Sequence, residues 1–220
     1  MVALFVVLTF VLFIAIDFFV LKSQGKEHPA FMSIHVFDKA SIFFPADALL
    51  AKGHMWLKQM KDGFIRLGID EFILKATGPF TLTALKAEGE QILRGEPLME
   101  AKFGKHSVLF RSPVQGVIGS VNKNLAGKKV TDPYDTDWAV TFRPIENTNQ
   151  LFSTMKSGKK ATEILKDEFN RFKDFLSFHS GEPELAGVTM ADGGNIVEGV
   201  LNNFNDEAVK DFEQKFLDIE

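Results

Sequence analysis

The chain has 220 residues, of which 45% are hydrophobic and 25% are charged, and this suffices for one well-filled domain with extensions. Its net charge of −4 at pH 7, and the lack of basic residues interleaved with aromatic ones, argue against nucleic acid as a partner. Cysteine is absent, which excludes disulfides, thiolate metal ligands and cysteine nucleophiles.

The first 22 residues are almost entirely apolar, since Thr9 and Asp17 are the only polar residues before Lys22. About 20 apolar residues of helix cross a hydrocarbon core, so the sequence predicts a transmembrane anchor at residues 1–22. A cleavable signal peptide is the alternative, disfavoured because no basic residue precedes the run and no small-residue cleavage site ends it. Lys22 and Lys26 follow the run, which predicts a single-pass membrane protein with its remaining domain in the cytoplasm.

Residues 23–44 begin with the polar run "SQGKEHPA", which contains Gly25 and Pro29, and continue with an irregular apolar segment. This composition predicts a linker that leads into the folded domain.

Residues 45–145 contain short apolar or alternating runs with glycines between them. The runs are "FIRLGI", "FTLTAL", "EPLMEAKF", "SVLFRS", "GVIGSVN" and "WAVTFRP". Short runs at this spacing predict a small, mostly antiparallel β-domain rather than alternating strands and helices.

Residues 146–220 have the pattern of helices. The first amphipathic face consists of Ile164, Leu165, Phe169, Phe172, Phe175 and Leu176. Two shorter helical patterns follow, one through Val197, Leu201 and Phe204 and one through Val209, Phe212 and Phe216, with Asn205 or Asp206 as a cap. We therefore predict a mainly β protein with a helical C-terminal extension.

The stretch "MEAKFGKHSVLFRSPVQG" at residues 99–116 is typical of a hairpin. Residues 98–103 and 107–110 read as two strands, and Gly104 between them supplies the positive φ that a tight turn requires. Lys105 is therefore expected in solvent at the tip. Taken alone, such a lysine is an ordinary turn residue.

Residues 45–144 resemble the glycine cleavage system H protein family, whose members are lipoyl carriers with a barrel-sandwich hybrid, or hammerhead, fold. The matching motifs are "PADALLAKGHMW", "LGIDEF", "GEP" at 95–97, "SPVQG" at 112–116, "VNKNL" and "DPYDTDW". Each motif is weak alone, but their order and spacing are specific. The resemblance implies a hammerhead domain at residues 45–145.

The same resemblance implies covalent lipoate on Lys105. In the family, the modified lysine lies eight residues after the proline of Gly-Glu-Pro and seven before the serine of Ser-Pro-Val, and both counts reach Lys105. Two flanking positions differ from the family pattern: its glutamate is Lys102 here, and its small residue after the lysine is His106. These differences leave an unmodified relative open as an alternative.

His106 has two interpretations. An imidazole beside the arm could move protons or lower the pKa of a neighbouring amine, but a solvated turn histidine is the simpler expectation.

The histidines are scattered without the spacing of a metal site, and His54 and Trp56 are expected to brace the core. No pattern of acids, bases or nucleophiles indicates an enzyme.

The sequence thus predicts a membrane-anchored carrier, with lipoate on Lys105, that shuttles an aminomethyl, one-carbon or redox group. Its implied protein partners belong to a glycine-cleavage-like or lipoate-dependent redox system. The alternative is an unmodified interaction module that recruits a complex to the membrane.

Overall fold

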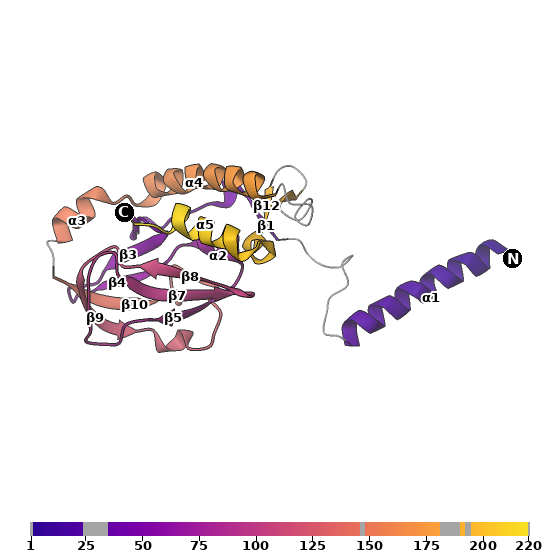
Figure 1. Ribbon diagram of the computed structural model, residues 1–220, viewed down its shortest axis with the longest axis horizontal. Coiled ribbons are helices and arrows are strands. Elements are labelled where there is room, and N and C mark those ends of the chain that lie inside the picture. Colours follow the sequence, from indigo (N-terminus) through magenta and orange to yellow (C-terminus); the bar gives the residue numbers. More distant parts are fainter. Residues whose placement is uncertain (1, 24–34, 146–147, 181–189, 192–194, 220) are drawn as a thin grey trace. The chain divides into compact units, whose positions relative to one another are not determined.

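The structure is a computed structural model that describes residues 2–23, 35–145, 148–180, 190–191 and 195–219 (Figure 1). The chain divides into two compact units, Met1–His35 and Val36–Glu220.

The first unit contains one helix, α1 (Val2–Ser23). Inside it the Thr9 hydroxyl donates to the carbonyl oxygens of Phe5 and Val6 at 3.1 and 2.8 Å, so this polar side chain is satisfied within the helix. Across the described part of the chain, no helix combines the length and apolar character needed to cross a membrane, and the transmembrane prediction for residues 1–22 is therefore not supported.

The second unit is mainly β. Its strands are β1 (Val36–Phe37), β2 (Leu49–Ala51), β3 (Met55–Gln59), β4 (Ile65–Ile69), β5 (Thr81–Ala84), β6 (Gln91–Ile92), β7 (Pro97–Phe103), β8 (His106–Arg111), β9 (Gly116–Val121), β10 (Val140–Pro144), β11 (Met190–Ala191) and β12 (Asn195–Val197). They form antiparallel sheets in the orders β2-β3-β4-β10-β9-β6, β5-β7-β8 and β1-β12-β11. The six predicted runs correspond to β4, β5, β7, β8, β9 and β10.

Helical segments accompany the sheets. They are the α-helices α2 (Glu71–Thr77), α3 (Thr148–Thr154), α4 (Gly158–His179) and α5 (Asp206–Phe216), and the 3₁₀ helices η2 (Lys39–Ser41), η3 (Lys123–Leu125) and η4 (Val200–Asn203). The sequence patterns did not indicate α2, a two-turn helix between β4 and β5. It begins at Asp70, whose carboxylate accepts from the Ile73 backbone N–H at 3.3 Å.

One prediction about the segments flanking the β-domain needs correction. The pattern through Val197, Leu201 and Phe204 does not form an α-helix, because Val197 belongs to β12 and pairs with Val36, and only the short η4 follows. Within the predicted linker and entry segment at 23–44, the structure contains β1 and η2, and residues 24–34 lie outside the described residues.

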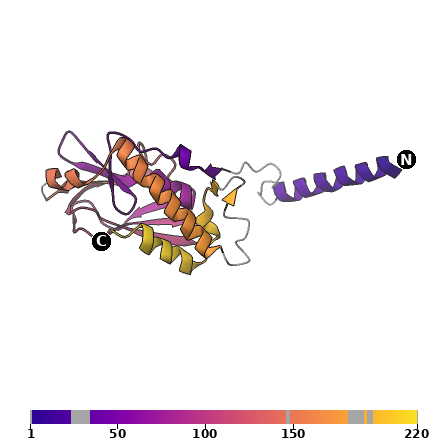
Figure 2. The ribbon, with the colours of Figure 1, turned by 90° about the horizontal axis from the view of Figure 1, so that it is seen from above.

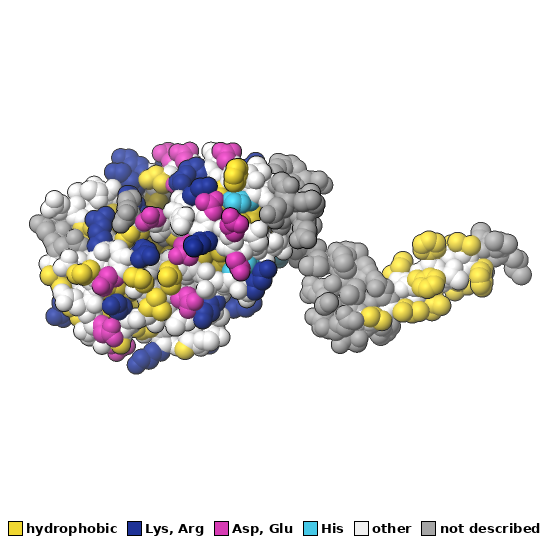
Figure 3. Space-filling model, in the orientation of Figure 1, with side chains coloured by type: hydrophobic (Ala, Val, Ile, Leu, Met, Phe, Trp, Pro, Cys, Tyr) yellow, Lys and Arg dark blue, Asp and Glu magenta, His cyan; other side chains and the backbone are white. Residues whose placement is uncertain are grey.

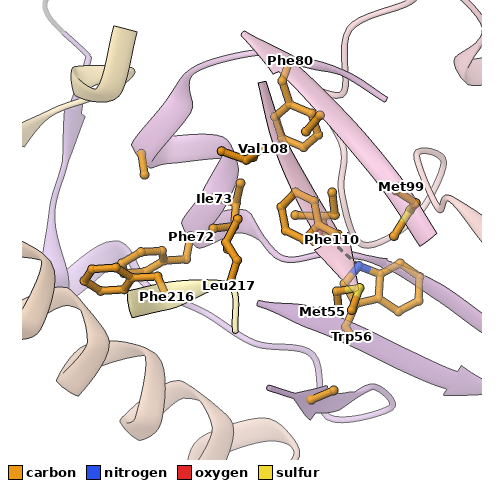
Figure 4. Packing of buried hydrophobic residues seen from close by; sticks show 14 of the residues in the cluster. Met55, Trp56, Phe72, Ile73, Phe80, Met99, Val108, Phe110, Phe216 and Leu217 are labelled. Atoms are coloured by element: carbon orange, nitrogen blue, oxygen red, sulfur yellow. Dashed lines mark hydrogen bonds between the residues drawn. The ribbon is translucent and has the colours of Figure 1, made fainter. Parts of the chain in front are cut away.

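The core of the β-domain forms around Trp56, which is 1% exposed. Its indole N–H donates to the carbonyl oxygens of Ile69 and Pro133 at 3.2 and 2.9 Å, so burial leaves no polar atom unsatisfied. Gly68 lies opposite Trp56 across β3 and β4, and a Cβ there would come within 2.6 Å of the indole. Figure 4 shows Trp56 beside Met55, with Phe110 of β8 nearby.

Helices α4 and α5 lie side by side and together cover one side of the strands (Figures 1 and 2). Phe172 of α4 is fully buried and makes edge contacts with Phe72, Phe212 and Phe216, with ring centroids 5.6 to 5.8 Å apart. Burying each such side chain contributes about 1.5 to 3 kcal/mol. The amphipathic helix predicted in 146–178 is confirmed, except that Ile164 is 40% exposed rather than on its buried face.

The end of α5 reaches the core of the domain. In Figure 4, Phe216 lies against Phe72, and Leu217 approaches Ile73 of α2. Asn205 caps the other end of α5 by accepting from the Ala208 backbone N–H at 2.8 Å, as the sequence allowed. The C-terminal end of the helix therefore packs on the same unit that contains β7 and β8.

Candidate functional site

Strands β7 and β8 form a hairpin whose turn consists of Gly104 and Lys105. The last paired residues are Phe103 and His106, so the connection is two residues long. Gly104 has a φ of +53°, whereas Lys105 does not have a positive φ, which is the pattern of a type II′ turn. Glycine adopts this conformation without the steric cost that a side chain would add.

The turn presents Lys105 to solvent between two buried rings. Lys105 is exposed, whereas Phe103 is 2% exposed and His106 is 5% exposed. Phe103 and His106 are directly opposite each other on the two strands, so their side chains lie on the same face of the hairpin. Their burial attaches both ends of the turn to the domain. The structure therefore places Lys105 where the hairpin pattern predicted it.

His106 is not the solvated turn histidine that the sequence suggested. Its Nδ1 lies 2.9 Å from Oδ1 of Asp206, the first residue of α5, while the Asp206 side chain itself is 91% exposed. The other ring nitrogen, Nε2, is buried and has no hydrogen-bond partner among the described residues. The expectation failed because α5, from the end of the chain, covers this side of the hairpin.

Asn202 of η4 lies against the turn from another direction. A Cβ built on Gly104 would come within 2.5 Å of the Asn202 Oδ1. The Asn202 side-chain N–H groups donate to the carbonyl oxygens of Thr77 and Gly199 at 2.6 and 2.9 Å. Asn202 thus connects the tip of the hairpin to the end of α2.

A groove of about 830 Å³ runs between β8 and α5, starting at Lys105. Its β8 side is lined by alternate residues, Lys105, Ser107, Leu109 and Arg111, and its α5 side includes Lys210 and Glu213. Figure 3 shows basic and acidic side chains interspersed on the face that carries α4 and α5. The groove is polar and open, so a flexible side chain on Lys105 has room to move beside it.

Glu213 binds the open edge of β8 inside this groove. Burial raises the pKa of its carboxyl above the ordinary glutamate value, while the Leu109 backbone N–H and the charges of Arg111 and Lys210 act in the opposite direction. Glu213 and Leu109 line the same groove, so α5 faces β8 beyond its first residue as well as at His106.

His54 and Trp56 are structural, as expected. The His54 Nδ1 lies 2.9 Å from Oδ2 of the fully buried Asp70, and the His54 ring stacks on Phe72 at 4.5 Å. Because Asp70 also caps α2, this pair fixes the start of β3 to that helix. Within the described part of the chain, no group of three or more histidine and acidic side chains could hold a metal ion.

Three residues that shape the site were not found by sequence reasoning: Asn202, Asp206 and Glu213. The available signal was that Asn205 or Asp206 could cap a helix, which says nothing about the surface the helix meets. Their role depends on a contact between segments far apart in the chain.

The structure is a mainly β domain with an exposed lysine at the apex of a two-residue hairpin turn. The sequence model described as "Glycine cleavage H-protein" matches residues 49–168, and the chain belongs to this family. Members of the family are carrier proteins, and they carry covalently attached lipoate.

The chain is also similar to individual proteins. The chain is 30% identical over 97 residues to a glycine cleavage system H protein of Mycobacterium avium, a match that covers 43% of this chain and 74% of the relative. It is 28% identical over 118 residues to a probable glycine cleavage system H protein of Pyrococcus abyssi, covering 52% and 87%. A crystal structure of a glycine cleavage system H protein from Mycobacterium marinum is 24% identical, covers 46% of this chain and 86% of that chain, and has a TM-score of 0.39. The family match ends at residue 168, within α4, so η4 and α5 lie outside it.

Proposed function

We propose that this chain is a lipoyl carrier in which Lys105 bears the lipoyl group. The observation that carries the proposal is the position of Lys105, exposed at the apex of a two-residue turn in a chain of the H-protein family. The polar groove that begins at Lys105 gives an attached arm space on the protein surface.

A lysine at this place suits the attachment chemistry. The neutral Lys105 amine attacks the carbonyl of an activated lipoyl acyl-adenylate, an amide bond forms, adenylate leaves and one proton is released to solvent. When attached, lipoate supplies a disulfide that accepts and returns electrons or a transferred group. The Lys105 side chain adds a flexible aliphatic chain to the arm, and the buried Phe103 and His106 fix the backbone on either side of the turn.

The names of the relatives suggest the partners. We infer that the attached arm serves enzymes of a glycine cleavage system, or of a related lipoate-dependent redox system, and carries an aminomethyl, one-carbon or redox group. The sign of the surface charge does not select among these partners, because basic and acidic residues are interspersed around the groove.

An unmodified interaction module is the second candidate. It is favoured by the residues around the lysine, since Lys102 replaces an acidic residue of the family pattern and His106 is buried against Asp206. In that case the hairpin would serve to hold α5, and the exposed helices would recruit partners.

Intact-mass measurement of the full chain from its native host tests the proposal. We expect a lipoyl mass increment that is absent in Lys105→Arg, which keeps the charge but cannot form the amide. Lys102→Arg, on the same hairpin, is the matched control and should keep the increment. An unmodified mass under lipoate-replete conditions would favour the interaction module.

The position of the protein in the cell remains a prediction from its first residues. Lys22 and Lys26 place the second unit in the cytoplasm only if residues 1–22 span a membrane, which the described helices do not support. The carrier proposal does not depend on this placement.

A further inference from the structure

The turn that contains Lys105 is enclosed by a segment outside the family match. η4 contacts Gly104 through Asn202, and α5 contacts His106 through Asp206, so the residues on both sides of Lys105 are held. We call this segment, residues 199–217, the clamp.

The contact between Asp206 and His106 matters because of where the imidazole lies. The His106 side chain is 2% exposed, and its Nε2 already lacks a hydrogen-bond partner among the described residues. If Asp206 could not accept, both ring nitrogens would be buried and unpaired, which is costly in a protein interior. His106 would then have to rotate or leave its site, and the adjacent Lys105 would move with it.

The contact between Asn202 and Gly104 restricts the other side of the turn. The Asn202 amide is held by the Thr77 and Gly199 carbonyl oxygens, so its Oδ1 cannot easily turn away from Gly104. Removing this side chain would leave open space beside a glycine, the residue type with the widest backbone freedom.

The clamp is itself anchored in the core, so it can transmit rigidity to the turn. Phe212 and Phe216 of α5 pack on Phe172, and His179 of α4 binds Asp211 at 2.9 Å. The side chains that meet the turn therefore project from a fixed surface and not from a loose extension.

We propose that Asn202 and Asp206 are positioning residues for the modification of Lys105, acting through Gly104 and His106. An enzyme that acylates a lysine must hold its amine close to the activated carboxyl, and a turn that is already rigid avoids the ordering cost of that step. The inference rests on the proposed function, because it concerns the attachment of lipoate to Lys105. It also accounts for His106, whose departure from the family pattern is matched by an aspartate on the added helix.

The test uses the full chain with a lipoate–protein ligase, lipoic acid and ATP, and follows the initial rate of modification by intact mass. We expect Asn202→Ala and Asp206→Ala each to lower the rate about fivefold while the variants remain folded by circular dichroism. Asn203→Ala and Glu207→Gln are the matched controls, since both side chains are exposed neighbours on the same segment, and both should stay within about twofold of wild type.

A double-mutant cycle separates positioning from a general loss of stability. If Asp206 acts through His106, then Asp206→Ala should have no further effect on the rate in a His106→Ala background. Asp206→Glu, which keeps a carboxylate, should retain most of the wild-type rate. Hydrogen exchange of the Gly104–His106 amides should become faster in Asn202→Ala and Asp206→Ala, and should not change in the two controls.

Two results would overturn the inference while leaving the carrier proposal in place: modification of both variants at the wild-type rate, or effects of His106→Ala and Asp206→Ala that multiply in the double variant. A wild-type chain that the ligase does not modify would overturn the proposed function itself, and with it the role of the clamp in attachment.

Discussion

The β7–β8 hairpin and helix α5 contribute to the same site by different means. The hairpin is formed by neighbours in the sequence, with Phe103 paired to His106 across a two-residue turn. Helix α5 comes from the end of the chain and reaches this turn through Asp206. The hairpin presents the Lys105 amine, whereas the distant helix contacts the residue that follows it.

The two regions also differ in their relation to the family. The hairpin lies within the residues that match the H-protein family, and α5 lies beyond them. The contact between the hairpin and α5 needs a residue from each region, because the Asp206 carboxylate pairs with His106, the residue after Lys105. We expect the stability of α5 and the order of the hairpin tip to change together.

The largest expected effect comes from separating α5 from the core. Phe172→Ala removes a fully buried ring that contacts Phe212 and Phe216, and we expect a loss of about 3 to 5 kcal/mol in the free energy of unfolding. Urea titration measures this loss, and hydrogen exchange should show that α5 opens more than β7 and β8.

Phe178→Ala is the control on the same helix, since its side chain is 76% exposed and its loss should cost about 0.5 kcal/mol or less. Equal effects of the two substitutions would contradict the view that Phe172 attaches α5 to the domain.

The next effect tests the contact between the hairpin and η4. Gly104→Ala introduces a side chain at a φ of +53° and within 2.5 Å of the Asn202 Oδ1, so we expect a loss of about 2 kcal/mol, of which about 1 is backbone strain. In an Asn202→Ala background the loss should fall to the strain alone, as measured by urea titration.

Gly63→Ala provides the matched control, because Gly63 has a φ of +83° and no atom lies within 4 Å of a Cβ there. Its cost should be about 1 kcal/mol. If Gly104→Ala costs no more than Gly63→Ala, then Asn202 does not restrict the turn.

The smallest effect is a pH dependence along α5. The pKa of Glu213 is raised, chiefly by burial, so its contribution to stability is present below the ordinary glutamate pKa and is lost as pH rises through the folded value. Glu213→Gln should therefore remove a fall in stability between mildly acidic and neutral pH. Thermal melts at several pH values measure it.

Asp211, on the same helix, should behave in the opposite way. Its pKa is lowered first by the hydrogen bond from Lys215 and then by that from His179, so its contribution is present above the ordinary aspartate pKa and is lost as pH falls. Asp211→Asn should therefore reduce the loss of stability at acidic pH. If Asp211→Asn and Glu213→Gln changed the pH dependence of stability in the same way, these opposite roles of the two carboxyl groups would be refuted.

Much of the β-domain could be predicted because its signals are local. The run "SVLFRS" became β8, and Gly104 marked the turn, since a tight hairpin needs a positive φ that glycine adopts readily. The position of Lys105 followed from the same neighbours. α2 was missed because seven residues between strands are too few to show a clear helical period.

Two helices of equal length show where composition and pattern carry different information. α1 and α4 each have 22 residues. In α4, apolar residues recur every three or four positions with charged residues on the opposite face. Its Phe169, Phe172 and Phe175 are buried, as this period predicted. α1 is apolar without such a period, and its composition alone led to the transmembrane prediction that the described helices do not support.

Local patterns were enough to predict a mainly antiparallel domain that presents Lys105 on a glycine turn, because strand alternation and turn geometry depend on residues a few positions apart. The burial of His106, the contact of Asn202 with the turn and the position of α5 along β8 became visible only in the folded molecule. Those contacts join segments far apart in the chain, and they form only because the phenylalanines of α4 and α5 must bury their rings on the same core.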